Sequence, residues 1–164
     1  TSSRKDSIVS KSSATPTDLV ELQWIEPDGG PEYSDWVALR EPILRAPQGL
    51  RFSAADLEEE KTQRHLVARE GDKIVGGLIV IPLADKWKIR QVAVEPSRQG
   101  EGLGFRIMEE AIIEAKRAGI AEVALHSRVN VVGFYEKLGF KIVGDEFIEV
   151  GIPHRKMVLS LGSG

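Results

Sequence analysis

The segment that most constrains the fold is "RQGEGLG" (98–104), which places three glycines at alternate positions. It follows an apolar stretch, "IRQVAVEP" (89–96), that is typical of a strand, and precedes "FRIMEEAIIEAKRAG" (105–119), which is typical of an amphipathic helix. Glycine weakens a strand-to-helix turn unless something must approach the backbone closely. The segment therefore indicates a mixed α and β chain with a ligand-binding turn between a strand and a helix.

Periodicity and turn residues extend this reading along the chain. The helix after the loop repeats apolar residues every 3.6 positions and closes at Gly119. A Gly-Asp turn between two apolar stretches predicts a hairpin, and Pro42 is expected to kink or split the first helix. The expected strands are 19–25, 65–70, 73–83, 87–96, 121–127, 140–150 and 153–161, and the expected helices are 33–47, 53–63, 103–118 and 129–139.

Composition narrows the function. The absence of cysteine excludes disulfides, thiolate metal sites and a covalent cysteinyl intermediate. Three histidines (His65, His126 and His154) lie far apart without metal-ligand spacing, so no metal is expected. A net charge of −3 with scattered basic residues gives no indication of nucleic-acid binding. The chain is expected to act as a monomer or homodimer.

The N-terminal segment and the apolar runs predict the limits of the domain and the cellular location of the protein. Residues 1–17 are rich in Ser, Thr and Lys and are expected to be a disordered tail before one domain at 18–161. This tail has no apolar signal core, and the longest apolar run (74–84) is too short to span a bilayer. A cytoplasmic protein without membrane association is therefore expected.

Three phosphate-binding patterns compete for the glycine loop. A P-loop needs Gly-Lys-Ser/Thr at its end, where Phe105 and Arg106 stand, and a dinucleotide-binding Gly-x-Gly-x-x-Gly fails at Phe105. The pattern Gln-x-x-Gly-x-Gly is met by Gln99, Gly102 and Gly104. Successive amides and the positive end of the next helix would then bind an anion, whereas the alternative is a plain tight turn.

"VAVEPSRQGEGLGFRIMEEA" together with "GFYEKLGF" resembles the GNAT superfamily of N-acetyltransferases, and "FIEVGIPHRKM" resembles its ElaA-like branch. The resemblance implies a GNAT fold (α/β, or α+β) in which about four helices flank a mixed, mostly antiparallel sheet of about seven strands. It also implies an enzyme with acetyl-CoA as co-substrate, which transfers acetyl to a primary amine of a small molecule or peptide by direct attack in a ternary complex. The alternative is a non-catalytic GNAT-like module that senses coenzyme A or an acyl-CoA.

The resemblance also implies where coenzyme A lies. In the family, backbone groups of the strand before the glycine loop contact the pantetheine arm and the acetyl carbonyl, and the loop amides hold the pyrophosphate. The residues expected to bind the coenzyme are Val92, Ala93, Val94, Gln99, Gly100, Glu101, Gly102, Leu103, Gly104, Arg128, Asn130, Phe134 and Tyr135.

Acetyl transfer needs a neutral amine, stabilisation of the developing oxyanion and a proton for the leaving thiolate. Tyr135 aligns with the family tyrosine that can protonate the thiolate; the alternative is a packed aromatic beside Phe134. For the general base the sequence offers His126, Glu149 and His154, and water is the alternative. The last two lie on the final hairpin, which borders the acceptor pocket in this family.

Two further features remain open in the sequence. Many family members carry Asn where this chain has Arg128, which either reaches the coenzyme or is a solvated surface residue, and Asn130 could also cap or begin the next helix. Arg40, Arg45 and Arg51 lie in the segment that walls the acceptor side in this family. Turned inward they would hold a carboxylate of the acceptor, and otherwise they lie on a solvated helix face.

Overall fold

The computed structural model describes residues 20–27, 30–45 and 54–162, with the side chains of residues 44 and 45 left aside. The expected tail at 1–17, Arg51 and the start of the second helix at residue 53 lie outside these ranges.

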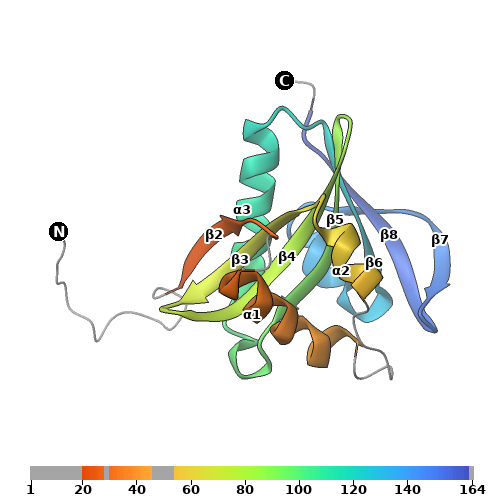
Figure 1. The fold of residues 1–164 in the computed structure, drawn as a ribbon. Coiled ribbons are helices and arrows are strands. Elements are labelled where there is room, and N and C mark those ends of the chain that lie inside the picture. Colours follow the sequence, from red (N-terminus) through yellow and green to blue (C-terminus); the bar gives the residue numbers. More distant parts are fainter. Residues whose placement is uncertain (1–19, 28–29, 46–53, 163–164) are drawn as a thin grey trace, which may run out of the picture.

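Seven strands form one sheet in the described part of the chain, in the order β2-β3-β4-β5-β6-β8-β7 (Figure 1). Neighbouring strands are antiparallel except for β5 and β6, which are parallel. This arrangement confirms the predicted mixed, mostly antiparallel sheet. The strands are β2 (Glu21–Ile25), β3 (Arg64–Glu70), β4 (Lys73–Leu83), β5 (Lys86–Val94), β6 (Glu122–Arg128), β7 (Lys141–Glu149) and β8 (Ile152–Ser160).

Four α-helices accompany the sheet in the described residues, as predicted: α1 (Pro31–Arg40), α2 (Ala54–Glu60), α3 (Leu103–Arg117) and α4 (Val132–Glu136). Short 3-10 turns precede α3 (Pro96–Arg98) and α4 (Val129–Val131), and α1 continues as a π-helix, Glu41–Arg45. The change from α to π geometry falls next to Pro42, because proline has no N–H to donate to the carbonyl four residues earlier. The predicted break in this helix is therefore confirmed.

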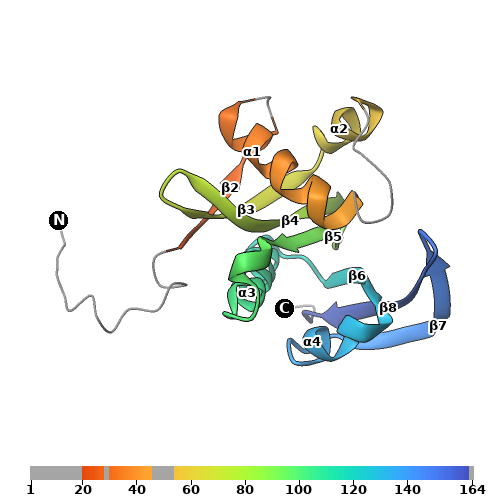
Figure 2. The ribbon, with the colours of Figure 1, turned by 90° about the horizontal axis from the view of Figure 1, so that it is seen from below.

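The helices cover the two faces of the sheet. Figure 2 shows α1 and α2 on one side and α3 and α4 on the other. The core beneath α3 contains the helix residues predicted from the 3.6 period, from Leu103 to Ala115, whereas Ala118 is exposed. The core on the opposite face is built around Trp36 of α1, which is fully buried. The sheet thus separates two apolar cores.

Gly77 of β4 permits the close packing of Trp36. A Cβ atom at position 77 would lie 2.4 Å from the backbone oxygen of Leu66 and 2.9 Å from the Trp36 ring. Real side chains do not tolerate such distances, so any larger residue would displace either the helix or the neighbouring strand.

A buried polar cluster ties α1 to α2. Arg40, whose side chain is fully buried, donates from both terminal nitrogens to the Glu60 carboxylate, each at 2.8 Å. Tyr33 donates its hydroxyl to the same carboxylate at 2.7 Å. Burial opposes ionisation of Glu60, but the hydrogen bonds and charge of Arg40 outweigh it and hold the pKa of Glu60 below its ordinary value. The expectation that Arg40 holds an acceptor carboxylate is therefore wrong, because its terminal guanidinium nitrogens already bind a carboxylate of the protein.

His65 belongs to the same cluster. The indole N–H of Trp36 donates to its Nδ1 at 3.1 Å, so the ring proton sits on Nε2, which donates to the backbone oxygen of Glu60 at 3.0 Å. Burial lowers the pKa of His65, which favours this neutral form. His65 is a structural residue without access to solvent.

Candidate active site

β5 and β6, the only parallel pair among the described strands, separate halfway along their length. β5 pairs with β6 from Lys86 to Ile89, opposite Glu122 to Leu125, and no further. Toward β4, the register shifts where Leu78 lies opposite two residues of β5, Gln91 and Val92. This is a β-bulge, and Gln91 adopts a positive φ of 58° within it. The bulge coincides with the divergence of β5 from β6, and residues 90–94 keep a backbone edge that β6 does not cover.

A cleft of about 690 Å³ lies at this divergence. Seven of the predicted site residues line it, from β5, the glycine loop, β6, α4 and the final hairpin. These are Val92, Gln99, His126, Arg128, Tyr135, Glu149 and His154.

The cleft wall also contains residues that were not predicted from the sequence. Lys88, Arg90 and Gln91 of β5 line it, as does the buried Ser127 of β6, which donates its hydroxyl to the backbone oxygen of Arg128 at 2.8 Å. Lys88, Arg90 and Arg128 form no ion pair with another described residue. The cleft therefore carries three cationic side chains suited to an anionic ligand.

Tyr135 is positioned by the aromatic packing of α4. Its ring makes edge contacts with Phe134 and Phe140, at centroid distances of 5.0 and 5.9 Å. The residue is 8% exposed, and burial raises the pKa of its hydroxyl to about 12. The hydroxyl accordingly stays protonated at neutral pH and makes no hydrogen bond to another described residue, so it remains a proton donor beside the cleft.

The glycine loop opens onto the start of α3. Gly100 and Gly102 have φ values of 85° and 83°, which other residues rarely adopt. The helix has no side-chain cap, and its first backbone bond runs from Arg106 N–H to Gly102 C=O. The amides of 103–105 therefore have no partner within the helix and point outward from its positive end.

Side chains near the loop fix its position. Arg98 donates to Glu101 at 3.0 Å and to Glu70 of β3 at 2.7 Å. The Gln99 side-chain amide donates to the backbone oxygen of Val94 at 3.0 Å. These contacts hold the loop against the ends of β3 and β5, and they occupy the side-chain nitrogen of Gln99, one of the predicted coenzyme-binding residues.

The remaining predicted coenzyme residues are not among those that line the cleft, and Leu103 is buried in the core beneath α3. A Cβ at Gly104 would stand 3.6 Å from the Phe134 ring and 3.7 Å from Val94, which are ordinary contacts. Ala93 is buried in the core around Trp36. Asn130 is exposed in the middle of the 3-10 turn before α4 and does not begin or cap a helix, because the cap of this turn is Arg128 and the cap of α4 is Val131.

The three predicted base candidates meet at one end of the cleft. His126 Nδ1 lies 2.9 Å from Glu149 Oε1, and His154 Nε2 lies 3.9 Å from Glu149 Oε2. His154 donates from Nδ1 to the backbone oxygen of Ile152 at 2.7 Å. Phe147 contacts both imidazoles, edge-on to His126 and stacked with His154. β6, β7 and β8 thus converge on a carboxylate between two imidazoles.

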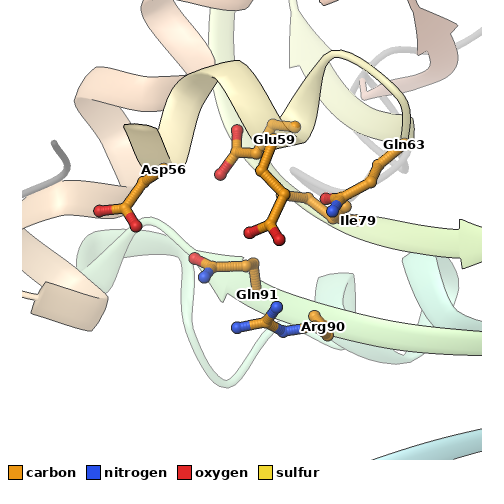
Figure 3. A pocket seen from close by; sticks show the side chains of 7 residues that line it. Asp56, Glu59, Gln63, Ile79, Arg90 and Gln91 are labelled. Carbon is orange, nitrogen blue, oxygen red and sulfur yellow. The ribbon is translucent and has the colours of Figure 1, made fainter. Parts of the chain in front are cut away.

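A second, small polar pocket lies between α2 and β5 (Figure 3). Figure 3 shows Asp56 and Glu59 of the helix above Gln91 and Arg90 of the strand. Its volume of about 40 Å³ is enough for a few water molecules and too small for a substrate. Gln91 and Arg90 line both hollows, so this pocket lies beside the cleft.

The described residues provide neither a metal site nor a helix able to span a membrane. Within residues 20–27, 30–45 and 54–162, no group of three or more His, Asp or Glu could hold a metal ion. None of the helices in those ranges has the length and apolar character needed to cross a membrane.

A mixed seven-stranded sheet with helices on both faces, and a cleft of ligand size where its two parallel strands diverge, defines an α/β protein with a candidate ligand-binding cavity. The family model described as the acetyltransferase (GNAT) domain matches residues 48–161, which is most of the chain. The chain therefore belongs to the GNAT acetyltransferase family, and the predicted resemblance is confirmed.

Known proteins are similar to this chain in sequence and in fold. The chain is 27% identical over 135 residues to the uncharacterized N-acetyltransferase YjcF of Bacillus subtilis, covering 77% of this chain and 91% of that protein. Escherichia coli ElaA shares the fold with a TM-score of 0.75 and 20% identity, over 87% of this chain and all (100%) of that one. An aminoglycoside 6'-N-acetyltransferase solved with coenzyme A has a TM-score of 0.71 and 20% identity, over 85% and 96% of the two chains.

Proposed function

We propose that this protein is an acetyl-CoA-dependent N-acetyltransferase that transfers the acetyl group to a primary amine in a ternary complex. The observation that carries the proposal is the cleft between β5 and β6, which brings a buried, protonated Tyr135 to the same cavity as the glycine-loop residue Gln99.

The described residues fit the coenzyme. The unpaired amides at the start of α3 and the cation of Arg128 match its phosphates. The uncovered backbone edge of β5, Val92–Val94, matches the amide groups of an extended pantetheine arm. When bound, acetyl-CoA supplies an acetyl group activated as a thioester.

The glycines of the loop have two distinct roles in this proposal. At positions 100 and 102, glycine is required by the positive φ and not by crowding. A Cβ atom at either position would have no other atom within 4 Å. Gly104 has helical geometry, so a side chain there would instead point among Phe134, Val94 and the space proposed for the pyrophosphate. Gly104→Val is therefore a cleaner test of coenzyme binding than Gly102→Val, which would also strain the loop.

Tyr135 is the proposed general acid. Its raised pKa favours the protonated form, and its hydroxyl is not engaged by another described residue. The hydroxyl is thus available to donate a proton to the departing thiolate. Direct attack by the amine is the economical route, because the chain contains no cysteine to carry the acetyl group.

Thiol release from acetyl-CoA in the presence of a panel of primary amines tests the function. The panel contains amino acids, polyamines, aminoglycosides, peptides with free N-termini and lysine peptides, and mass spectrometry identifies the acetylated product. We expect amine-dependent thiol release that Tyr135→Phe reduces. Coenzyme A binding without turnover on any amine would instead support the alternative of a coenzyme A sensor.

A further inference from the structure

The carboxylate between the two imidazoles has an asymmetry that distinguishes His126 from His154. Glu149 contacts His126 at 2.9 Å, a hydrogen-bonding distance, but stands 3.9 Å from His154. The His126 side chain is 29% exposed and the His154 side chain 7%. His126 is therefore the imidazole with both a firm partner and access to the cleft.

We propose that His126 is the general base that takes the proton from the acceptor amine, and that Glu149 is the residue that positions it. This inference rests on the proposed acetyltransferase function. Neutral imidazole carries one ring proton, and an ionised carboxylate can only accept. The bond to Glu149 thus places the proton of His126 on Nδ1 and leaves the Nε2 lone pair free, with no partner among the described residues.

His154 has a different role. Its Nδ1–H is used by the backbone oxygen of Ile152, and its Nε2 faces Glu149 from beyond hydrogen-bonding distance. Phe147 lies against both rings, at centroid distances of 4.9 Å to His126 and 6.0 Å to His154. Phe147 therefore packs between the two imidazoles and restricts the plane of the His126 ring.

The charged groups around His126 come from every neighbouring strand. Lys156 of β8 lies opposite His126 in the sheet. Arg128, two residues along β6 and on the same face as His126, lies opposite His154. Lys88 and Arg90 of β5 line the same cleft. Among these cations, Glu149 is the carboxylate that contacts His126, at 2.9 Å. An orienting carboxylate that stabilises the imidazolium is the arrangement used by catalytic triads.

The proton inventory of the proposed step balances. The amine nitrogen uses its lone pair to bond to the carbonyl carbon, and its proton moves to His126 Nε2. As the carbon–sulfur bond breaks, sulfur keeps the bonding pair and receives the proton of the Tyr135 hydroxyl. Tyr135 regains a proton from His126 through solvent, so both side chains return to their starting forms and the products are the acetamide and coenzyme A.

Nitrogen-15 NMR of the imidazoles tests the arrangement without turnover. Two-bond proton–nitrogen spectra of the wild type above neutral pH should show His126 as the Nδ1–H tautomer. Glu149→Leu removes the acceptor of the Nδ1 proton, so the proton should no longer be held on Nδ1 and the Nε2–H tautomer should appear. Glu146→Leu is the matched control: Glu146 lies exposed on the same strand, outside the cleft, and should leave the tautomer unchanged. An Nε2–H tautomer in the wild type would overturn the proposal.

Kinetics with acetyl-CoA and the amine identified by the panel give the second readout. His126→Gln should lower kcat by about 10²–10⁴-fold, the usual contribution of a general base, with the KM for acetyl-CoA unchanged. Activity of this variant should recover as pH rises, because hydroxide can then take the proton that the amine nitrogen loses as it attacks. Glu149→Gln should lower kcat with the same pH recovery, Glu149→Asp should restore part of it, and Glu146→Gln should match the wild type.

The outcomes separate the two proposals. Wild-type kcat in His126→Gln, with amine-dependent turnover intact, refutes the base and leaves the acetyltransferase standing. A loss in His126→Gln that does not recover with pH refutes proton abstraction and indicates a structural role. No turnover by the wild type on any amine refutes the acetyltransferase and the base together, whatever the NMR tautomer.

Discussion

Replacing Glu60 by glutamine should destabilise the fold strongly, although the change is nearly isosteric. The Glu60 carboxylate accepts two bonds from the Arg40 guanidinium at 2.8 Å and one from the Tyr33 hydroxyl at 2.7 Å. A glutamine offers one oxygen and one NH₂ group, and the latter would face an N–H donor. The fully buried Arg40 would also lose its carboxylate partner.

The expected cost follows from burial. Removing one partner of a buried ion pair costs about 3–5 kcal/mol, because the other charge stays out of water. For a domain of this size each kcal/mol lowers Tm by about 2–4 °C, so Glu60→Gln should lower Tm by about 6–20 °C. The chain offers a matched control on the same helix: Glu58 pairs with Lys61 at 3.1 Å, but the two side chains are 72% and 56% exposed. Glu58→Gln should cost less than about 1 kcal/mol.

Urea unfolding followed by circular dichroism measures both variants against the wild type. The account predicts a large loss of unfolding free energy for Glu60→Gln and almost none for Glu58→Gln, with unchanged m-values. Equal, small effects of the two substitutions would show that the Arg40–Glu60 pair does not secure α1 to α2 as described.

Three further outcomes are expected. Gly77→Ala should lower the unfolding free energy by about 1–3 kcal/mol in urea titrations, because the new Cβ would lie 2.4 Å from the Leu66 oxygen; a neutral effect would contradict this packing. Tyr135→Phe should lower kcat by about 10²–10⁴-fold with little change in KM for acetyl-CoA, and wild-type kcat would assign the acid elsewhere. Tm should fall as pH drops below 6.5 and further below 4.5, because the pKa values of buried His65 and of Glu60 are lower in the folded than in the unfolded state. A Tm independent of pH between 7 and 4 would contradict these two shifts.

Local patterns in the sequence predicted the elements well. The 3.6 period of α3 identified its buried face, and Gly119 and Gly139, both with positive φ, end the two helices that they were expected to end. The sequence alone locates the glycine loop, because its pattern lies within seven consecutive residues, 98–104. Boundaries moved by only a few residues, as at β5, which ends at Val94 rather than Pro96.

The bulge in β5 was missed although the sequence carries a trace of it. Trp87 and Ile89 face the core beneath α3, and Val92 and Val94 pack against that same core. Alternate residues of a regular strand face the same side, but Ile89 and Val92 are three positions apart and contact the same core. One extra residue is therefore needed between them, and the structure provides it at Gln91. The prediction of one strand over 87–96 includes no bulge, and it therefore does not predict the divergence of β5 from β6.

Contacts between distant segments could not be read from the sequence. Arg40 and Glu60 each lie on a helix rich in charge, and such residues usually face solvent; their burial depends on how α1 and α2 pack together. The bond between His126 and Glu149 joins residues 23 positions apart on strands separated by β8 in the sheet. The sequence supplied both as candidates, but only the strand order and register show that they meet.

Calorimetric titration of coenzyme A into the wild type and Gly104→Val tests whether the glycine loop and the cleft bind coenzyme A. The account predicts saturable binding of one coenzyme A per chain to the wild type, with loss of binding in Gly104→Val at an unchanged circular dichroism spectrum, because the valine side chain would occupy the space proposed for the pyrophosphate. Absence of binding to the wild type, or equal affinity in the folded variant, would contradict the assignment of this loop and cleft to coenzyme A.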